Sequence, residues 1–296
     1  MKKDIFSESK KLYRLAKIIR NNFESWNYEE IFMPFMEEYT NSFRGGLKYT
    51  DSNNFFLIKP DATSQIISRI KKADEYRCFY FNEYFPIQGE CSLQFGAEFI
   101  GKNPLQQKLE ILSVVFTILK SVGIEDFYID IGSLENLNGI LKEVPEFKTK
   151  ILKALEKRNF SIVEDMNIDK EIKKRLWEIF SFRGKKSGIK QLDQIVEKLP
   201  EENIFIDTGT IRYLEYYEDI VFEIYSPLTG KPLGGGGDYK VGGMTGFGFF
   251  MDLKDLSKIC DICVQEFREL VTGDIKETYE RSRELTMNGK KVEVVL

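Results

Sequence analysis

The chain has no histidine among its 296 residues, and this absence excludes several kinds of chemistry. Catalytic triads that depend on histidine, histidine general bases and histidine metal ligands are all ruled out. Any proton transfer by this protein would therefore have to use carboxylate, lysine, tyrosine or cysteine side chains.

Cysteine is scarce as well, since the chain has only 4. Cys78 and Cys91 stand alone, whereas Cys260 and Cys263 form a C-x-x-C pair within residues 256–270, where we expect an amphipathic helix. This spacing is compatible with a zinc or redox site. Reduced thiols in the core of a cytosolic protein are the better interpretation, and we expect neither a metal nor a cofactor.

Long apolar runs and a basic surplus are also missing. No apolar run approaches the roughly 18 residues of a membrane-spanning helix, and the charged N-terminus is unlike a signal peptide, so we expect a cytoplasmic protein. The 43 basic and 47 acidic residues give a net charge of -4, which argues mildly against a dedicated nucleic-acid binder. With 42% hydrophobic residues, the chain can form one large core, or one core and a small appendage.

The apolar periodicity predicts an α+β domain in which an antiparallel sheet is flanked by helices. Helices are expected over residues 9–26, 105–122, 252–270 and 275–288, and over a short segment that Asp61 or Thr63 caps and that runs to about Lys72. Strands are expected over residues 28–35, 55–58, 77–85, 92–101, 126–131, 204–206, 220–225, 244–250 and 291–296.

The remaining segments predict the domain organisation. Residues 136–198 are mostly helical in pattern and charged, with a break at residues 183–188, and we interpret them as an inserted helical subdomain. Residues 44–54, 86–91 and 227–231 are expected to be loops or turns. The glycines at 234–237 lack the spacing of a phosphate-binding loop and are expected to connect two strands tightly. The prediction is a core of residues 1–272 and a C-terminal helix and strand over 273–296.

Several motifs resemble those of the histidyl-tRNA synthetases, which belong to the class II aminoacyl-tRNA synthetases. Residues 26–34 (WNYEEIFMP) resemble motif 1, and residues 59–63 (KPDAT) resemble the R-P-E/D-x-T element with Lys59 in place of arginine. Residues 94–101 (QFGAEFIG) resemble the end of motif 2. Residues 212–217 with 221–223 (RYLEYY and VFE) resemble the histidine-specific motif, residues 236–239 a shortened G-G-R-Y-D, and residues 248–256 motif 3.

These motifs follow one another in family order over residues 7–270, which implies the class II synthetase fold. The resemblance places self-dimerisation at residues 28–35. Residues 279–296 resemble the first helix and strand of an anticodon-binding domain, and the remainder of that domain is expected to be absent.

The resemblance also implies that two phosphate-binding arginines are lost. The motif 2 arginine aligns with Asn82 and the motif 3 arginine aligns with Asp255. Amino-acid activation brings a carboxylate to the α-phosphate of ATP and requires fixed positive charge there. A neutral amide and a carboxylate do not supply that charge, so synthetase activity is expected to be lost.

The amino-acid pocket is better preserved. By resemblance, the α-amino group of histidine would be held by Asp61, Thr63 and Glu98, with Gln94 contacting the substrate, Arg212 near its carboxylate, and Tyr216 and Tyr217 flanking the imidazole. Carboxylates suit an ammonium group and a guanidinium suits a carboxylate. Taken singly, each residue also has a structural interpretation, such as a helix cap for Asp61 or a core aromatic for Tyr216.

A retained histidine pocket without activation chemistry resembles the regulatory subunits of ATP phosphoribosyltransferase. The resemblance implies a non-catalytic protein that a short catalytic subunit requires for activity. It also implies a dimer within a hetero-oligomer, and L-histidine as the feedback inhibitor of the first step of histidine biosynthesis. We expect no membrane partner, and tRNA is disfavoured. The alternatives are a truncated histidyl-tRNA synthetase and a free-standing paralogue that binds an amino acid or tRNA.

Overall fold

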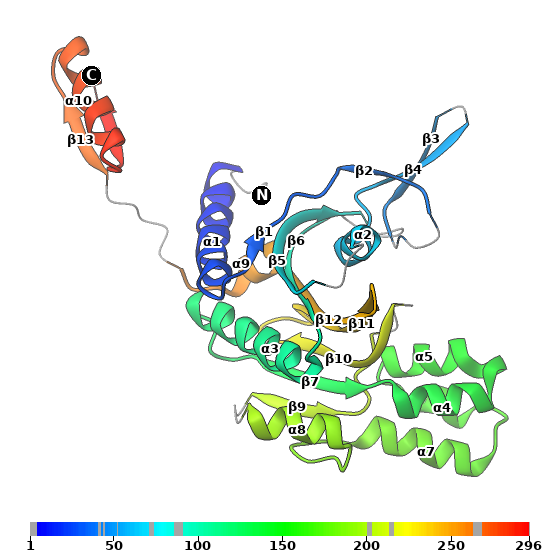
Figure 1. The fold of residues 1–296 in the computed structure, drawn as a ribbon. Helices are drawn as coiled ribbons and strands as arrows, with labels where there is room; N and C mark the ends of the chain where they lie inside the picture. Colours follow the sequence, from blue (N-terminus) through cyan, green and yellow to red (C-terminus); the bar gives the residue numbers. More distant parts are fainter. Residues whose placement is uncertain are drawn as a thin grey trace. The chain divides into compact units, whose positions relative to one another are not determined.

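The computed structural model describes residues 5–40, 43, 45–51, 53–70, 74–85, 91–199, 203–212, 216–262 and 268–295. It divides the chain into two compact units, Met1–Asp261 and Ile262–Leu296 (Figure 1). None of the described helices is long and apolar enough to cross a membrane.

A nine-stranded sheet forms the centre of the first unit, with the order β1-β5-β6-β12-β11-β10-β7-β9-β8. Its strands are β1 (Glu29–Glu30), β5 (Tyr76–Tyr84), β6 (Ser92–Gly101), β12 (Met244–Asp252), β11 (Gly234–Val241), β10 (Tyr217–Tyr225), β7 (Tyr128–Ser133), β9 (Ile204–Asp207) and β8 (Arg183–Gly184). All neighbours from β5 to β7 are antiparallel. The predicted α+β fold is therefore confirmed, and β6 has the bounds that the sequence predicts.

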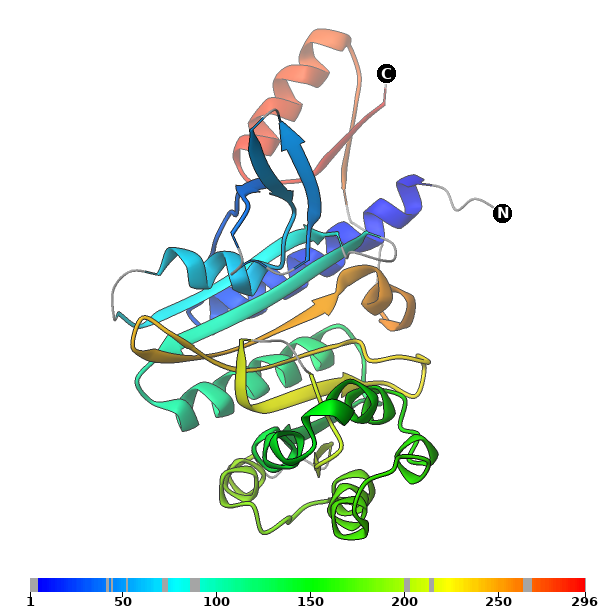
Figure 2. The same cartoon turned by 90° about the vertical axis from the view of Figure 1, so that its right-hand side faces the viewer.

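Helices α1 (Ile5–Ser25), α3 (Pro104–Ser121) and α9 (Leu253–Ile259) belong to one layer beside this sheet (Figures 1 and 2). The side chain of Phe23 on α1 stacks on Phe79 of β5, with ring centroids 4.7 Å apart. Because side chains alternate along a strand, Phe95 of β6 faces this layer while Gln94 and Glu98 face the other side. The alternation thus separates an apolar face from a polar one.

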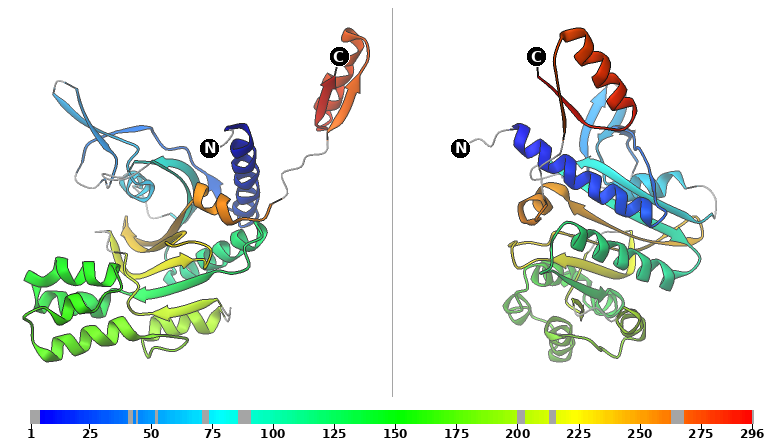
Figure 3. Two further views of the ribbon diagram at one scale, coloured as in Figure 1. Left: turned by 180° about the vertical axis from the view of Figure 1, so that it is seen from behind. Right: turned by 90° about the vertical axis from the view of Figure 1, so that its left-hand side faces the viewer.

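The polar face carries α2 (Ala62–Arg69), and Asp61 caps this helix by accepting a 2.8 Å hydrogen bond from the Ser64 amide. Ala62 and Ile66 pack with Tyr80 and Tyr239 from the sheet. A second sheet has the order β2-β4-β3, formed by β2 (Met36–Glu38), β4 (Asn54–Ile58) and β3 (Leu47–Asp51). The turned views in Figure 3 show this small sheet apart from the helical insertion.

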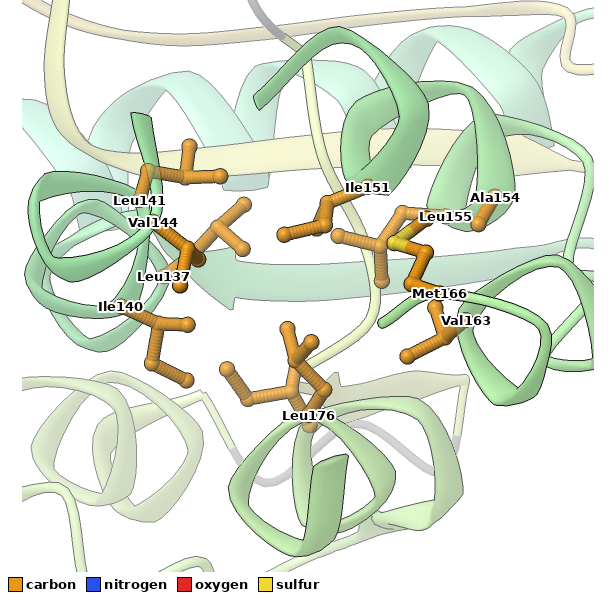
Figure 4. Packing of buried hydrophobic residues seen from close by; sticks show 11 residues of the cluster. Leu137, Ile140, Leu141, Val144, Ile151, Ala154, Leu155, Val163, Met166 and Leu176 are labelled. Atoms are coloured by element: carbon orange, nitrogen blue, oxygen red, sulfur yellow. The ribbon is translucent and has the colours of Figure 1, made fainter. Parts of the chain in front are cut away.

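The residues of the expected helical insertion form several helices that share a hydrophobic cluster of their own. Its elements are α4 (Glu135–Glu143), the 3-10 turn Pro145–Phe147, α5 (Lys148–Glu156), α6 (Ser161–Glu164), α7 (Lys170–Ser181) and α8 (Lys190–Lys198). Strand β8 occupies the predicted break after α7. Leu137, Ile151 and Leu176 point toward one another from three helices (Figure 4).

The second unit contains β13 (Glu269–Thr272), α10 (Ile275–Met287) and β14 (Val292–Val295). The two strands pair in parallel, and Gly289 adopts a φ of 74° just after α10. The helix predicted over residues 252–270 is wrong at its end, because α9 ends at Ile259 and β13 is a strand that pairs with β14. Cys260 is buried, whereas Cys263 lies outside the described residues.

Other predictions are wrong where polarity or glycine concealed a strand. Residues 44–54, expected as a loop, contain β3, whose five residues are all exposed and carry no apolar alternation. Gly234–Gly237 belong to β11 rather than to a connection. A Cβ atom at Gly236 would lie 1.8 Å from the Gly248 carbonyl oxygen, so the close approach of these strands requires glycine there.

The ends of two further elements differ from the prediction. Of the strand expected over residues 28–35, only Glu29 and Glu30 pair with β5. Helix α2 ends at Arg69, while residues 71–73 lie outside the described part, as do residues 86–90 of the expected hairpin loop.

Candidate functional site

Glu98 lies at the centre of a buried polar cluster on the polar face of the sheet. Its side chain, in a residue only 1% exposed, accepts hydrogen bonds from Thr63 Oγ1 (2.6 Å) and from the Tyr239 hydroxyl (2.9 Å). Burial raises the pKa of Glu98 to about 8, although both hydrogen bonds lower it and the nearby Asp61 charge raises it further. A cation would therefore stabilise the charged form of Glu98, and the described part of the cluster supplies no such cation.

Asp61 provides the second carboxylate of this cluster. It combines the helix-capping bond from Ser64 with a hydrogen bond from Tyr216, and burial raises its pKa despite both. Among the described residues, neither Asp61 nor Glu98 forms an ion pair with a lysine or arginine. Two carboxylates that accept bonds only from neutral donors favour the binding of a cation between them.

Aromatic rings form the walls around these carboxylates. The rings of Tyr216 and Tyr217 meet edge to face at 4.8 Å, and Tyr216 meets Tyr239 at 6.4 Å. Burial raises the pKa of Tyr217 to about 12 and raises the pKa of Tyr216, Tyr239 and Tyr80 well above the usual value. The hydroxyls are therefore neutral donors at physiological pH.

The sequence interpretation missed Tyr80 and Tyr239 as members of this cluster. Tyr80 hydrogen-bonds with Thr63 and feels the charges of both carboxylates. Tyr239 lies in the shortened G-G-R-Y-D resemblance, but its bond to Glu98 joins strands that are far apart in the sequence. The only sequence signal for Tyr80 was its position two residues before Asn82 on one strand face.

Glycine at 248 makes room for the Glu98 carboxylate. A Cβ atom at Gly248 would lie 1.7 Å from Glu98 Oε2 and 2.8 Å from the Ala97 carbonyl oxygen. The motif 3 glycine therefore serves the pocket through its lack of a side chain.

Arg212 lies on the same sheet face but is paired with a carboxylate. Its Nη1 is 3.5 Å from Glu223 Oε1, and its guanidinium carbon lies 4.9 Å from the centre of the Phe250 ring. Its Nε is buried without a hydrogen-bond partner in the described part of the chain. Arg212 also lowers the pKa of Tyr217, which places it within electrostatic reach of the aromatic walls.

The sequence-predicted phosphate positions lie along the same face. Asn82, Gln94 and Asp252 form one row across β5, β6 and β12, four residues along β6 from Glu98. Asn82 is buried and accepts a 3.1 Å hydrogen bond from Lys59 Nζ. The structure thus brings Asp61, Thr63, Glu98 and the two tyrosines together, and leaves Gln94 nearer to Asn82.

Asp255 at the start of α9 does not face an empty space. Its carboxylate pairs with Lys231 Nζ at 2.5 Å and with Lys258 Nζ at 2.6 Å. Partial burial acts to raise its pKa, but the two lysines outweigh burial and lower it. Within the described residues, no group of three or more histidine, cysteine, aspartate or glutamate side chains has a geometry that could hold a metal ion.

Comparison with known proteins finds relatives of two kinds. The chain is 28% identical over 257 residues to the ATP phosphoribosyltransferase regulatory subunit of Aquifex aeolicus, covering 80% of this chain and 64% of the relative. It is also 28% identical over 281 residues to the histidine–tRNA ligase of Methanococcus vannielii, covering 78% and 66%. The chain thus spans less than two thirds of the length of either relative.

Solved structures share the fold at lower identity. A regulatory subunit/histidyl-tRNA synthetase from Bacillus halodurans superposes with a TM-score of 0.78 at 20% identity, covering 99% of this chain and 90% of that one. A chain of the ATP phosphoribosyl transferase complex from Thermotoga maritima superposes with a TM-score of 0.67 at 20% identity, covering 85% and 98%. The histidyl-tRNA synthetase family matches residues 5–201 and 181–256. Since that match extends over most of the sequence, the chain belongs to the histidyl-tRNA synthetase family.

Proposed function

We propose that this chain is a non-catalytic regulatory subunit of ATP phosphoribosyltransferase, which its catalytic subunit requires for activity and through which histidine inhibits. The observation that carries this proposal is the contrast between the two halves of the polar face. The ammonium-binding half has two carboxylates, the half-buried Asp61 and the buried Glu98. At the two positions where the family resemblance places phosphate-binding arginines, the chain has Asn82 on the polar face and Asp255 at the start of α9.

The structural surroundings of Asp255 support the loss of synthetase chemistry. Its carboxylate forms ion pairs with Lys231 and Lys258, and these pairs partly neutralise the two lysine charges. Activation of an amino acid requires fixed cations at the α-phosphate, and here the two nearest lysines are held in ion pairs by Asp255. This argument favours a regulatory role over a truncated synthetase, although relatives of both kinds are equally similar in sequence.

L-Histidine is the proposed ligand of the tyrosine-walled cluster. Asp61, Thr63 and Glu98 would hold its ammonium group, because both carboxylates lack a cation among the described residues. Tyr216 and Tyr217 would flank the imidazole with aromatic faces and neutral hydroxyls. Gln94 and Arg212 are the remaining proposed contacts, and Arg212 offers a buried Nε without a partner.

Self-association is the second part of the proposal. Phe32 is 89% exposed and lies at the rim of a pocket of about 510 Å³ that Ile31, Met33 and Ile70 also line. One patch that contains both a protruding ring and a hollow is self-complementary, as a two-fold interface requires. We propose that two copies pair through this patch and that the catalytic subunit binds elsewhere on the dimer.

The second unit is proposed to correspond to the beginning of an anticodon-binding domain. Its α10 and β14 carry the resemblance, and β13 belongs to the same unit because it pairs with β14. No tRNA-binding role is assigned to it.

Co-expression with short catalytic subunits tests the proposed function. We expect a complex to co-purify, phosphoribosyl transfer to depend on this chain, and histidine to inhibit the complex, with a coupling of about 1–3 kcal/mol between histidine and the catalytic state. ATP–pyrophosphate exchange in the presence of histidine should be absent. Clear exchange would establish a synthetase instead, and co-purification of RNA without a transferase subunit would favour a free-standing paralogue.

A further inference from the structure

Lys59 stands out among the cations near the pocket because its charge has no acidic partner in the described part of the chain. Its ammonium group donates to the neutral amide oxygen of Asn82 at 3.1 Å and lies 5.3 Å from the centre of the Phe35 ring. No described aspartate or glutamate forms an ion pair with it. The pair formed by Arg212 and Glu223, in contrast, is already neutral overall.

The backbone at Lys59 is fixed in an uncommon conformation. Its φ is 47°, in the left-handed region that non-glycine residues rarely adopt. The Lys59 amide donates to the Phe35 carbonyl oxygen at 2.9 Å, and the Lys59 carbonyl accepts from the Phe85 amide at 3.5 Å. The surrounding strands therefore hold this residue in place, with its side chain directed to Asn82 on the polar face.

Lys59 and the ammonium-binding carboxylates lie on the same face of the sheet. The charge of Asp61 acts on both Tyr80 and Tyr84, which flank Asn82 on one face of β5. Asn82 also stands directly opposite Gln94 of β6. Among the described residues, a cation without an acidic partner and two carboxylates without a cation thus lie on one face of the sheet, and a zwitterion requires both kinds of charge.

We propose that Lys59 binds the carboxylate of the amino-acid ligand, a role that the family resemblance assigns to Arg212. The proposal rests on the proposed histidine pocket and adds the residue that recognises the acidic end of the ligand. Lys59 supplies this charge from the connection between β4 and α2, whereas the family resemblance would supply it from Arg212. Arg212 then stays paired with Glu223 and supports the wall formed by Phe250.

The test compares ligands with and without a carboxylate. Isothermal titration calorimetry of the full chain with L-histidine and with histamine, which lacks only the carboxylate, gives a discrimination ratio for each variant. A charge-assisted contact corresponds to a preference for histidine of roughly ten- to a hundredfold. We expect Lys59→Gln to reduce this ratio to near unity while histamine affinity is unchanged, and Lys59→Arg to retain most of it.

Two further variants make the result decisive. Lys48→Gln removes an exposed lysine that also lies over an aromatic ring, 4.9 Å from the centre of Tyr39, and should leave the ratio unchanged. Arg212→Gln should lower the affinity for both ligands together and preserve the ratio. If the ratio falls in Arg212→Gln and persists in Lys59→Gln, the proposal for Lys59 is overturned while the histidine pocket stands. If the unaltered protein binds neither ligand, both proposals are wrong.

Discussion

Glu98 combines deep burial with hydrogen bonds from two neutral hydroxyls. Its 1% exposure and the bonds from Thr63 and Tyr239 leave the charged form without a cation in the described cluster. A pKa of about 8 in the folded protein, against an ordinary value of 4.5, means that Glu98 keeps its proton at neutral pH. Binding of an ammonium group would release that proton, so ligand affinity and pH are linked at this residue.

The raised pKa of Glu98 predicts how stability depends on pH. Between about pH 4.5 and pH 8 the unfolded chain has lost this proton while the folded chain keeps it, so the free energy of unfolding falls as pH rises. Across the whole window the effect is on the order of 5 kcal/mol. Glu98→Gln removes this pH dependence. In urea unfolding at pH 5, 6.5 and 8, the free energy of unfolding of the variant should therefore rise relative to that of the unaltered protein as pH rises. Glu83→Gln, at an exposed position, is the control, and parallel curves for Glu98→Gln would contradict the prediction.

Gly248 predicts a second effect of a single residue. In Gly248→Ala, the added methyl group would lie 1.7 Å from Glu98 Oε2, so the carboxylate must move. We expect a loss of roughly 1–3 kcal/mol in the free energy of unfolding and loss of ligand binding. Gly139→Ala is the matched control, because its methyl group meets no atom within 4 Å and lies in α4. That variant should be stabilised by roughly 0.5–1 kcal/mol in urea unfolding. Equal changes in the free energy of unfolding for the two variants would show that the contact with Glu98 does not matter.

The strands differ in how well they could be predicted from the sequence, because their burial and composition differ. Strand β6 was predicted with its full bounds because one face meets the apolar layer and the other does not. Strand β3 was missed because all five of its residues are exposed. In β11 four glycines allow the backbones of neighbouring strands to approach closely. This strand was missed because a run of glycines in a sequence more often indicates a turn.

The site residues that lie in one short motif could be predicted from the sequence, whereas those that meet through strand pairing could not. Asp61 and Thr63 lie in one short motif, and that motif identified both residues together with the helix cap. Tyr80 joins the cluster through cross-strand registry and Tyr239 through its bond to Glu98, and a single sequence does not reveal either contact. The pairing of Arg212 with Glu223, and of Lys59 with Asn82, likewise depends on which strands become neighbours.

The helical insertion predicts a local response to a cavity. Leu176 of α7 is fully buried and points toward Leu137, Ile140 and Ile151 (Figure 4). Leu176→Ala should cost about 2–5 kcal/mol within this cluster. Because the insertion has its own core, hydrogen exchange should accelerate in α4–α7 and remain slow in β5 and β6. Leu176→Met conserves volume and should cost less than about 1.5 kcal/mol. Faster exchange across the whole sheet would show instead that the insertion and the sheet unfold together.

Several exposed apolar residues lie together in one segment of the first unit. Phe32, Phe35, Leu47 and Phe55 are each more than half exposed, and all lie between β1 and the end of β4. A monomer would present these side chains to water, whereas a two-fold interface would remove them from it. The same segment leads directly into Lys59 and Asp61, so the proposed interface and the proposed ligand site are adjacent in the sequence.

A charge at the tip of this surface tests self-association. Phe32→Glu would place a carboxylate at an apolar contact, and we expect the dimer to weaken by roughly a hundredfold or more. Sedimentation equilibrium should give about twice the chain mass of 34.6 kDa for the unaltered protein and the single chain mass for the variant. Leu228→Glu, in a turn where the leucine is 66% exposed, is the matched control and should remain dimeric. If Phe32→Glu also remains dimeric, the interface lies elsewhere. If that dimeric variant binds histidine normally, the pocket does not depend on this surface.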